Sequence, residues 1–146
     1  MADNATLVRS LMEAWNERDF DKLADSIATD GKIVVVGSGQ TFTGPDGSRA
    51  FDSMWADAFP DGRITLDRLI ESGAHVVVEY TGRGTHTGTL RTAMGEIPAT
   101  GRSLTLQLCD VYEITEGKIQ SQHSYFDTGS LMAQLGLTGQ PASQTQ

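Results

Sequence analysis

The sequence predicts an α+β fold, in which helices come first and a curved antiparallel sheet follows, with the helices packed over its concave face. Apolar residues recur every three or four positions up to residue 59, and every second position after residue 63. The clearest strands, residues 102–115 and 118–127, are joined by the two residues Glu116 and Gly117, which are typical of a hairpin turn. Helices and strands that are separated along the chain in this way pack as two layers.

Three helices are expected in the first part of the chain, each from an apolar stripe at helical spacing. They cover residues 4–18, 20–30 and 46–59. Asp3 or Asn4 can cap the first helix, because a short polar side chain can accept a hydrogen bond from a free amide of the first turn. Between the second and third helices, residues 33–36 predict a brief buried strand, and a loop rich in glycine and serine continues to residue 45.

Four longer strands are expected after the third helix. They cover residues 64–70, 75–87, 102–115 and 118–127. The inward face of the second strand is predicted to carry Val76, Val78, Tyr80, Gly82, Gly84 and His86. Residues 90–101 predict an irregular flap over one end of the sheet. A short terminal helix stopped by Gly136 completes a single domain over residues 1–137, and residues 138–146 predict a disordered tail.

Net charge, cysteine count and the lack of long apolar runs exclude several classes of partner and location. The 146 residues include 19 acidic and 11 basic side chains, and the net charge of −8 argues against nucleic acid and anionic membranes as partners. The single cysteine, Cys109, excludes a disulfide framework within the chain. No apolar run approaches the roughly 20 residues of a membrane span, and the N-terminus lacks the order of a secretion signal. These features favour a cytoplasmic location.

One carboxylate interrupts an apolar face of the first hairpin strand. By strict alternation, Asp110 shares that face with Leu104, Leu106, Leu108, Tyr112 and Ile114. Burial raises the pKa of a carboxyl group, so Asp110 can act as a general acid or base near pH 7. The alternative is a structural acid that is hydrogen-bonded to a group of the first helix, such as the Asn16 amide. Both interpretations are open from the residues alone.

Two histidines are further catalytic candidates. His123 can relay a proton to Asp110, although alternation puts it on the face opposite Gln122 and Ser124 unless a bulge shifts the phase. His86 has the inward phase of its strand, with a solvated or loop-bonded histidine as the alternative. The side chains expected to contact a substrate are Trp15, Asn16, Met54, Trp55, Tyr80, Leu108, Gln122, Ser124 and Phe126. The histidines and acids show no metal-ligand spacing, so no metal is expected.

Several short signatures occur in a characteristic order. They are residues 14–16 (Ala-Trp-Asn), 42–45 (Phe-Thr-Gly-Pro), 84–88 (Gly-Thr-His-Thr-Gly), 98–102 (Pro-Ala-Thr-Gly-Arg), 117–119 (Gly-Lys-Ile) and 125–127 (Tyr-Phe-Asp). Together they resemble the SnoaL-like polyketide cyclases, a branch of the NTF2-like cone fold, over residues 5–137. The resemblance implies a conical cavity between the helices and the sheet.

The resemblance also implies an activity, the intramolecular aldol closure of a polyketide ester without metal or cofactor. In the family a carboxylate near the end of the last strand acts as acid and base, and its position here falls on Ser124. The assisting histidine of the preceding strand falls on Asp110. Asp127 also matches a family position, where we expect it to cap the terminal helix.

We therefore expect a cofactor-independent enzyme, similar to a cyclase or an isomerase, that acts on a hydrophobic polycyclic or polyketide-type molecule. Asp110 would move the proton, and Gln122, Ser124 and His86 would hold the enolate oxygen. One alternative is a non-catalytic ligand-binding or dimerisation module of the same fold. Another is an epoxide hydrolase, which would need two acids and an arginine in the cavity. A homodimer is expected through an outer sheet face that carries Val77, Thr81, Cys109 and Val111.

Overall fold

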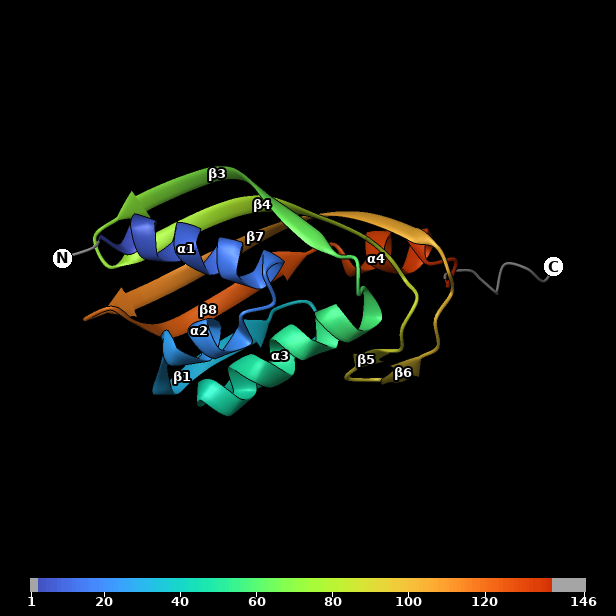
Figure 1. Cartoon of the computed structure of the whole chain (residues 1–146), viewed down its shortest axis with the longest axis horizontal. Helices are drawn as coiled ribbons and strands as arrows, with labels where there is room; N and C mark the ends of the chain where they lie inside the picture. Colours follow the sequence, from blue (N-terminus) through green and yellow to red (C-terminus); the bar gives the residue numbers. More distant parts are fainter. Residues whose placement is uncertain (1–2, 138–146) are drawn as a thin grey trace.

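The structure, a computed structural model, describes residues 3–137. This part of the chain forms four α-helices and eight β-strands (Figure 1). In chain order they are α1 (Asn4–Asn16), α2 (Phe20–Asp25), β1 (Ile27–Val35), β2 (Gln40–Thr43), α3 (Gly44–Ala58), β3 (Arg63–Ser72), β4 (His75–Thr85), β5 (Leu90–Thr92), β6 (Gly95–Ile97), β7 (Ser103–Thr115), β8 (Lys118–Phe126) and α4 (Thr128–Gln134). The predicted tail, residues 138–146, lies outside the described residues.

Six strands form one sheet in the order β2-β1-β8-β7-β4-β3, and β5 pairs with β6 as a separate hairpin. Neighbouring strands of the six-stranded sheet are antiparallel, except for β1 and β8, which run parallel. Helices α1, α2 and α3 lie together over one face of this curved sheet, as Figure 1 shows. The predicted α+β class, with the N-terminal helices over the concave face, is confirmed.

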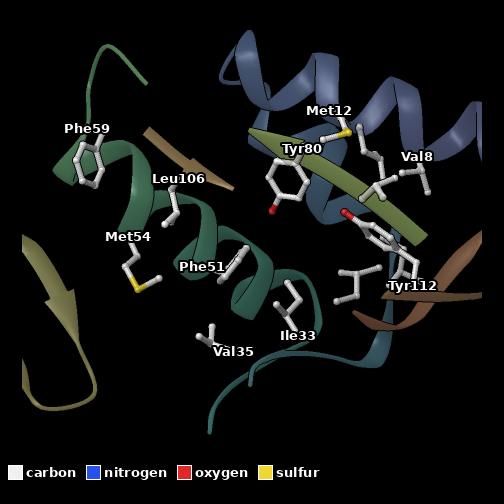
Figure 2. Close-up of a cluster of buried hydrophobic side chains, with 14 of the residues drawn as sticks. Val8, Met12, Ile33, Val35, Phe51, Met54, Phe59, Tyr80, Leu106 and Tyr112 are labelled. Atoms are coloured by element: carbon white, nitrogen blue, oxygen red, sulfur yellow. The ribbon is translucent and has the colours of Figure 1, made fainter. Parts of the chain in front are cut away.

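Alternation in the central strands separates a core face from an outer face. Val76, Val78 and Tyr80 of β4 are buried, and each faces a residue of β7 across the sheet. Buried side chains from α1, α3 and β1 pack against them and complete the core (Figure 2). The predicted hairpin turn is present, with positive φ angles at Glu116 (53°) and Gly117 (75°). This backbone suits the right-handed twist of the two strands that it joins.

Two side-chain amides form hydrogen bonds with strand backbone groups that have no neighbouring strand as a partner. Asn16, at the end of α1, accepts a hydrogen bond from Ile64 N (2.8 Å) and donates one to Ile64 O (2.9 Å) on edge strand β3. Gln134 of α4 does the same for Thr105 of β7, at 2.9 and 2.8 Å, beyond the point where β8 ends. Each amide imitates the paired N–H and C=O groups of a neighbouring strand, which satisfies the backbone.

Aspartates begin three of the helices. Asp3, Asp19 and Asp127 each accept a hydrogen bond from a backbone amide three residues later, and so cap α1, α2 and α4. The expected capping role of Asp127 is therefore present in the structure. Such caps matter most for α2 and α4, because helices of six and seven residues are too short to be stable alone.

The structure corrects three expectations from the sequence. Ile27 lies in β1, not in the second helix, because it pairs with Ile119 of β8 and this tertiary contact outweighs its helical spacing. Residues 40–43 of the expected loop form β2. The flap contains the hairpin of β5 and β6, which is too short to show a clear alternating pattern. Within residues 3–137, no helix is long and apolar enough to cross a membrane.

The two hydrogen bonds between Asn16 and Ile64, here called the Asn16 clamp, can be tested by their effect on stability. Asn16→Ala removes two hydrogen bonds and leaves the amide of Ile64 without its partner, so we expect a loss of about 1–3 kcal/mol in the free energy of unfolding. Asn4→Ala is the matched control in the same helix, since its amide makes one long contact of 3.5 Å. Urea unfolding followed by circular dichroism measures both. Equal midpoints for the two variants would mean that the clamp does not stabilise β3.

Candidate active site

A cavity of about 110 Å³ lies between the helices and the inward face of the sheet. Its walls are mainly apolar, and they include Leu11, Trp15, Phe51, Trp55, Tyr80 and Leu108. The lining also includes Arg63 and Arg83, whose side chains are exposed, and this marks the rim where the cavity meets solvent. Among this apolar lining the polar groups stand out, because each lies where water is scarce.

Asp110 of β7 is the acid at the centre of the sheet wall. It is 2% exposed and lines the cavity, as the alternation of β7 predicts. Its Oδ2 atom accepts hydrogen bonds from the Tyr80 hydroxyl (2.9 Å) and from Gln122 Nε2 (3.0 Å). These donors come from the strands on either side of β7, so three strands together fix the carboxyl group.

The register of the sheet explains this arrangement. Asp110 lies directly opposite Val78 of β4 and Ser124 of β8, while Tyr80 and Gln122 are diagonal neighbours on the same face. Long side chains can reach across a diagonal in a sheet. Asp110 Oδ1 and Ser124 Oγ are both buried, and neither forms a hydrogen bond with another of the described residues. Both hydrogen bonds of the carboxyl group thus reach Oδ2, while the Ser124 hydroxyl lies close enough to influence the charge of the group.

The environment changes the acidity of Asp110. Burial raises its pKa from the ordinary value of 3.8 to about 6, because the anion loses the water that would solvate it. The nearby hydroxyl groups of Ser124 and Tyr80 and the amide of Gln122 stabilise the anion and oppose part of this rise. At neutral pH Asp110 is therefore ionised, but it takes up a proton far more readily than a surface aspartate does.

A second acid, Asp52 of α3, lines the same cavity from the helical layer. It is 5% exposed, and burial raises its pKa to about 8. The negative charge of Asp110 adds to this rise, and the Ser48 hydroxyl one turn earlier opposes it. Asp52 was not among the site residues predicted from the sequence. The available signal was its place on the inner face of the third helix, where Ser48, Asp52 and the half-buried Trp55 are spaced by four and three.

Two tyrosines accompany the acids. Burial raises the pKa of Tyr80 and of Tyr112 well above the usual 10, and the charge of Asp110 contributes to both shifts. The charge of Asp52 acts on Tyr112 as well, so this hydroxyl group lies within reach of the fields of both acids. Both rings lie among the buried side chains of α1 and α3 in Figure 2. Both hydroxyl groups remain protonated and can donate hydrogen bonds.

Five residues expected to contact a substrate do line the cavity. They are Trp15, Trp55, Tyr80, Leu108 and Gln122. Trp15 is held by Arg18, whose guanidinium group stacks 4.3 Å from the ring centroid. Arg18 also donates hydrogen bonds to Pro60 O (2.9 Å) and Gly62 O (2.8 Å) in the turn after α3. One arginine thus joins the wall formed by α1 to the rim of the cavity.

Other expected contact residues do not reach the cavity. The Asn16 amide is engaged by Ile64, which also removes it as the partner of Asp110. Met54 is a buried core residue, and Phe126 packs edge-on against Trp55 with ring centroids 5.5 Å apart. Ser124 lies beside Asp110 and is not part of the lining. Helical and strand spacing alone cannot separate a cavity wall from the core behind it.

Neither histidine joins Asp110. His123 lies on the outer face, paired with Val111 and Val34, because β8 resumes strict alternation after its irregularity and turns Gln122 and Ser124 inward. His86 is fully buried beyond the end of β4, where its Nδ1 lies 2.9 Å from Thr100 Oγ1 and its ring packs against Phe59. Burial lowers the pKa of His86. It belongs to the base of the flap rather than to the cavity.

Comparison with solved structures identifies the same architecture elsewhere. TsrD from Streptomyces laurentii has 27% sequence identity and a TM-score of 0.77, with 94% of this chain and 100% of that chain covered. IdmH from Streptomyces antibioticus has 25% identity and a TM-score of 0.75, with 92% and 99% covered. A protein from Catenulispora acidiphila, described as having a ketosteroid isomerase-like fold, has 21% identity and a TM-score of 0.75, with 96% and 97% covered.

A search of the curated proteins finds no match to this sequence. The family model for the SnoaL-like polyketide cyclases, in contrast, matches residues 5–135, which is nearly the whole of the described chain. The match agrees with the cone of helices over a curved sheet and with the resemblance in the short signatures. The chain belongs to the SnoaL-like polyketide cyclase family.

Proposed function

We propose that this protein catalyses a cyclase-like or isomerase-like reaction, in which a proton is removed from a carbon next to a carbonyl group of a hydrophobic molecule. The observation that carries the proposal is a buried carboxylate, Asp110, at the wall of an apolar cavity and with a pKa raised to about 6. A base with a pKa just below neutral is ionised and still binds a proton well, which is the compromise that general-base catalysis requires.

The contacts of Asp110 fit this role. Tyr80 and Gln122 hold Oδ2 at 2.9 and 3.0 Å, so the carboxylate cannot turn freely, and Oδ1 forms no hydrogen bond with the described residues. An oriented base avoids the entropy that a free one would lose in the transition state. The reaction moves protons and forms or shifts carbon–carbon bonds without a change of oxidation state, so it requires no redox cofactor.

The cavity restricts how a substrate can bind. Its volume of about 110 Å³ is below the roughly 300–1,000 Å³ of sites that enclose a drug-sized ligand. A polycyclic or polyketide-type substrate would therefore insert the reacting ring and leave the rest of its skeleton at the rim near Arg63 and Arg83. Trp15 and Trp55 offer flat apolar surfaces to the inserted ring.

A ligand-binding module without catalysis is the alternative, and one observation favours it. Ser124 stands where the resemblance to the family implies a carboxylate, and a hydroxyl group cannot replace that base at neutral pH. In such a module Asp110 would serve as a buried hydrogen-bond acceptor for Tyr80 and Gln122. Epoxide hydrolysis is a lesser alternative, since two acids line the cavity but its two arginines are exposed.

Asp110→Asn separates these functions, because asparagine keeps the size of the side chain and removes the base. The probe is 2-tetralone, a bicyclic ketone with enolisable C–H bonds, whose exchange of hydrogen for deuterium in D₂O is followed by NMR. We expect wild-type protein to accelerate the exchange, and the variant to lose about 10²- to 10⁴-fold in rate.

Asp67→Asn is the matched control, since this exposed aspartate of β3 bonds Thr81 (2.6 Å) and does not line the cavity. It should retain the wild-type rate. Exchange no faster than in buffer with wild-type protein, or full activity of Asp110→Asn, would contradict the proposal. Unchanged binding of 2-tetralone to Asp110→Asn without any wild-type turnover would support the binding module.

We also propose that the protein is a cytoplasmic homodimer. The outer face of the sheet carries a continuous row of cross-strand neighbours, which are Ile70, Val77, Val111, His123 and Val34. Large apolar side chains in this row or beside it are exposed, and they include Ile70 (54%), Tyr125 (45%) and Val36 (40%). A second copy could cover this apolar strip with the same strip of its own, as a two-fold interface requires.

The dimer can be tested by placing a charge in the middle of the row. We expect Val111→Lys to raise the dissociation constant of the dimer at least tenfold, because burying an unpaired ammonium group costs well over about 1.4 kcal/mol. Thr105→Lys, on the same face of β7 but outside the apolar row, should leave the dimer intact. Analytical ultracentrifugation measures both. Wild-type protein that sediments as a monomer throughout the micromolar range would refute the interface.

A further inference from the structure

Helix α3 carries three aspartates, and one differs from the others in its surroundings. Asp46 is exposed in the first turn, and Asp57 is exposed and forms an ion pair with Arg91 at 3.1 Å. Asp52 is 5% exposed and lines the cavity on the wall that faces the sheet. Within residues 3–137 it takes part in no salt bridge. A buried acid without a cation is unfavourable as an anion, so it holds its proton.

The two acids of the cavity come from different layers of the fold. Asp52 is attached to the helical layer and Asp110 to the sheet, so a ligand that occupies the cavity lies between helix and sheet. The acids interact, since the charge of Asp110 disfavours ionisation of Asp52. The charges of both acids also raise the pKa of the Tyr112 hydroxyl. A ligand in the cavity therefore has one ionised acid on one wall and one neutral acid on the other.

We propose that Asp52 is a second catalytic residue, the general acid that delivers its proton to the substrate carbonyl oxygen while Asp110 removes the proton from the neighbouring carbon. This inference rests on the proposed function and assigns the group that meets the developing negative charge. Gln122 is engaged by Asp110, Ser124 is outside the lining, and His86 lies at the flap. Two of these three expected groups thus do not reach the cavity, and the third already donates a hydrogen bond to the base.

The step balances with the two carboxyl groups alone. The C–H bond breaks and its proton goes to Asp110, while its electron pair forms a carbon–carbon double bond. The carbonyl π electrons move to oxygen, which takes the proton of Asp52, and the substrate becomes an enol. Asp110 is now neutral and Asp52 is ionised. Asp52 regains its proton when the enol attacks an electrophilic carbon or is reprotonated by Asp110 at another position.

The acidities of the two groups suit opposite tasks. Asp110, with a pKa of about 6, is ionised at pH 7, and Asp52, with a pKa of about 8, is protonated there. Environments that separate the pKa values of two acids in this way assign one acid as the base and the other as the proton donor. Because the groups are coupled, the pair titrates with two apparent values, and the productive form is most abundant between them.

The pH dependence of catalysis tests the assignment. With 2-tetralone as the probe, we expect kcat/KM for exchange to follow a bell with limbs near pH 6 and pH 8. Asp52→Asn should lower kcat/KM by about 10²-fold or more and should abolish the limb near pH 8 while the limb near pH 6 remains. Asp57→Asn, on the same helix, should keep both limbs.

The result also separates the inference from the function on which it rests. Loss of activity in Asp110→Asn with a wild-type profile in Asp52→Asn would overturn the role of Asp52 and leave the proposed function standing. Full activity in Asp110→Asn would overturn the proposed function itself. Activity lost in both variants, with the limb near pH 8 missing from the residual rate of Asp52→Asn, would support both.

A measurement without substrate tests the proton on Asp52. Its folded pKa is above the ordinary value of 3.8, so its contribution to stability is complete below about pH 4 and is lost as the pH rises towards 8. Asp52→Asn lacks this dependence. We expect its urea midpoint to rise relative to wild type between pH 4 and pH 8, a rise that Asp57→Asn should not show. A difference between Asp52→Asn and wild type that stays constant with pH would mean that Asp52 is not protonated in the folded protein.

Discussion

Burial of the Asp110 carboxylate governs how the central strands can be aligned. Asp110 lies in the middle of the sheet, and an anion there is tolerated because Tyr80 and Gln122 donate hydrogen bonds to it from the two neighbouring strands. Any slip of register by one residue would turn one of these donors to the opposite face. The three central strands therefore have to keep one alignment, and the chemistry of the cavity is a consequence of that alignment.

Side-chain contacts at the margins of the sheet also stabilise this alignment. Asn16 clamps edge strand β3, and Gln134 closes β7 where β8 has ended, so helices at both ends of the chain fix strands far away in sequence. Arg18 adds a third link, between the cavity wall at Trp15 and the turn after α3. Polar side chains outside the cavity thus hold elements that surround it, because they satisfy backbone groups that would otherwise lack a partner.

Membership of the family is compatible with an acid at position 110 instead of position 124. The resemblance implies a carboxylate where Ser124 stands, and Ser124 is the direct cross-strand neighbour of Asp110. Side chains so related lie about 5 Å apart, although Asp110 lines the cavity and Ser124 does not. One fold can in this way carry its acidic groups on different strands.

The residues alone allowed a correct prediction of the α+β class, the hairpin with its turn, the inward face of the central strands and the exceptional position of Asp110. These features follow from the periodicity and turn chemistry of the sequence. It could not determine that Ile27 begins a strand, that His86 belongs to the flap and His123 to the outer face, or that Asn16 holds a backbone. Asp52 was missed for the same reason. Its meaning depends on a helix and a sheet, distant in sequence, that enclose one cavity, and only tertiary packing decides which polar groups are buried together.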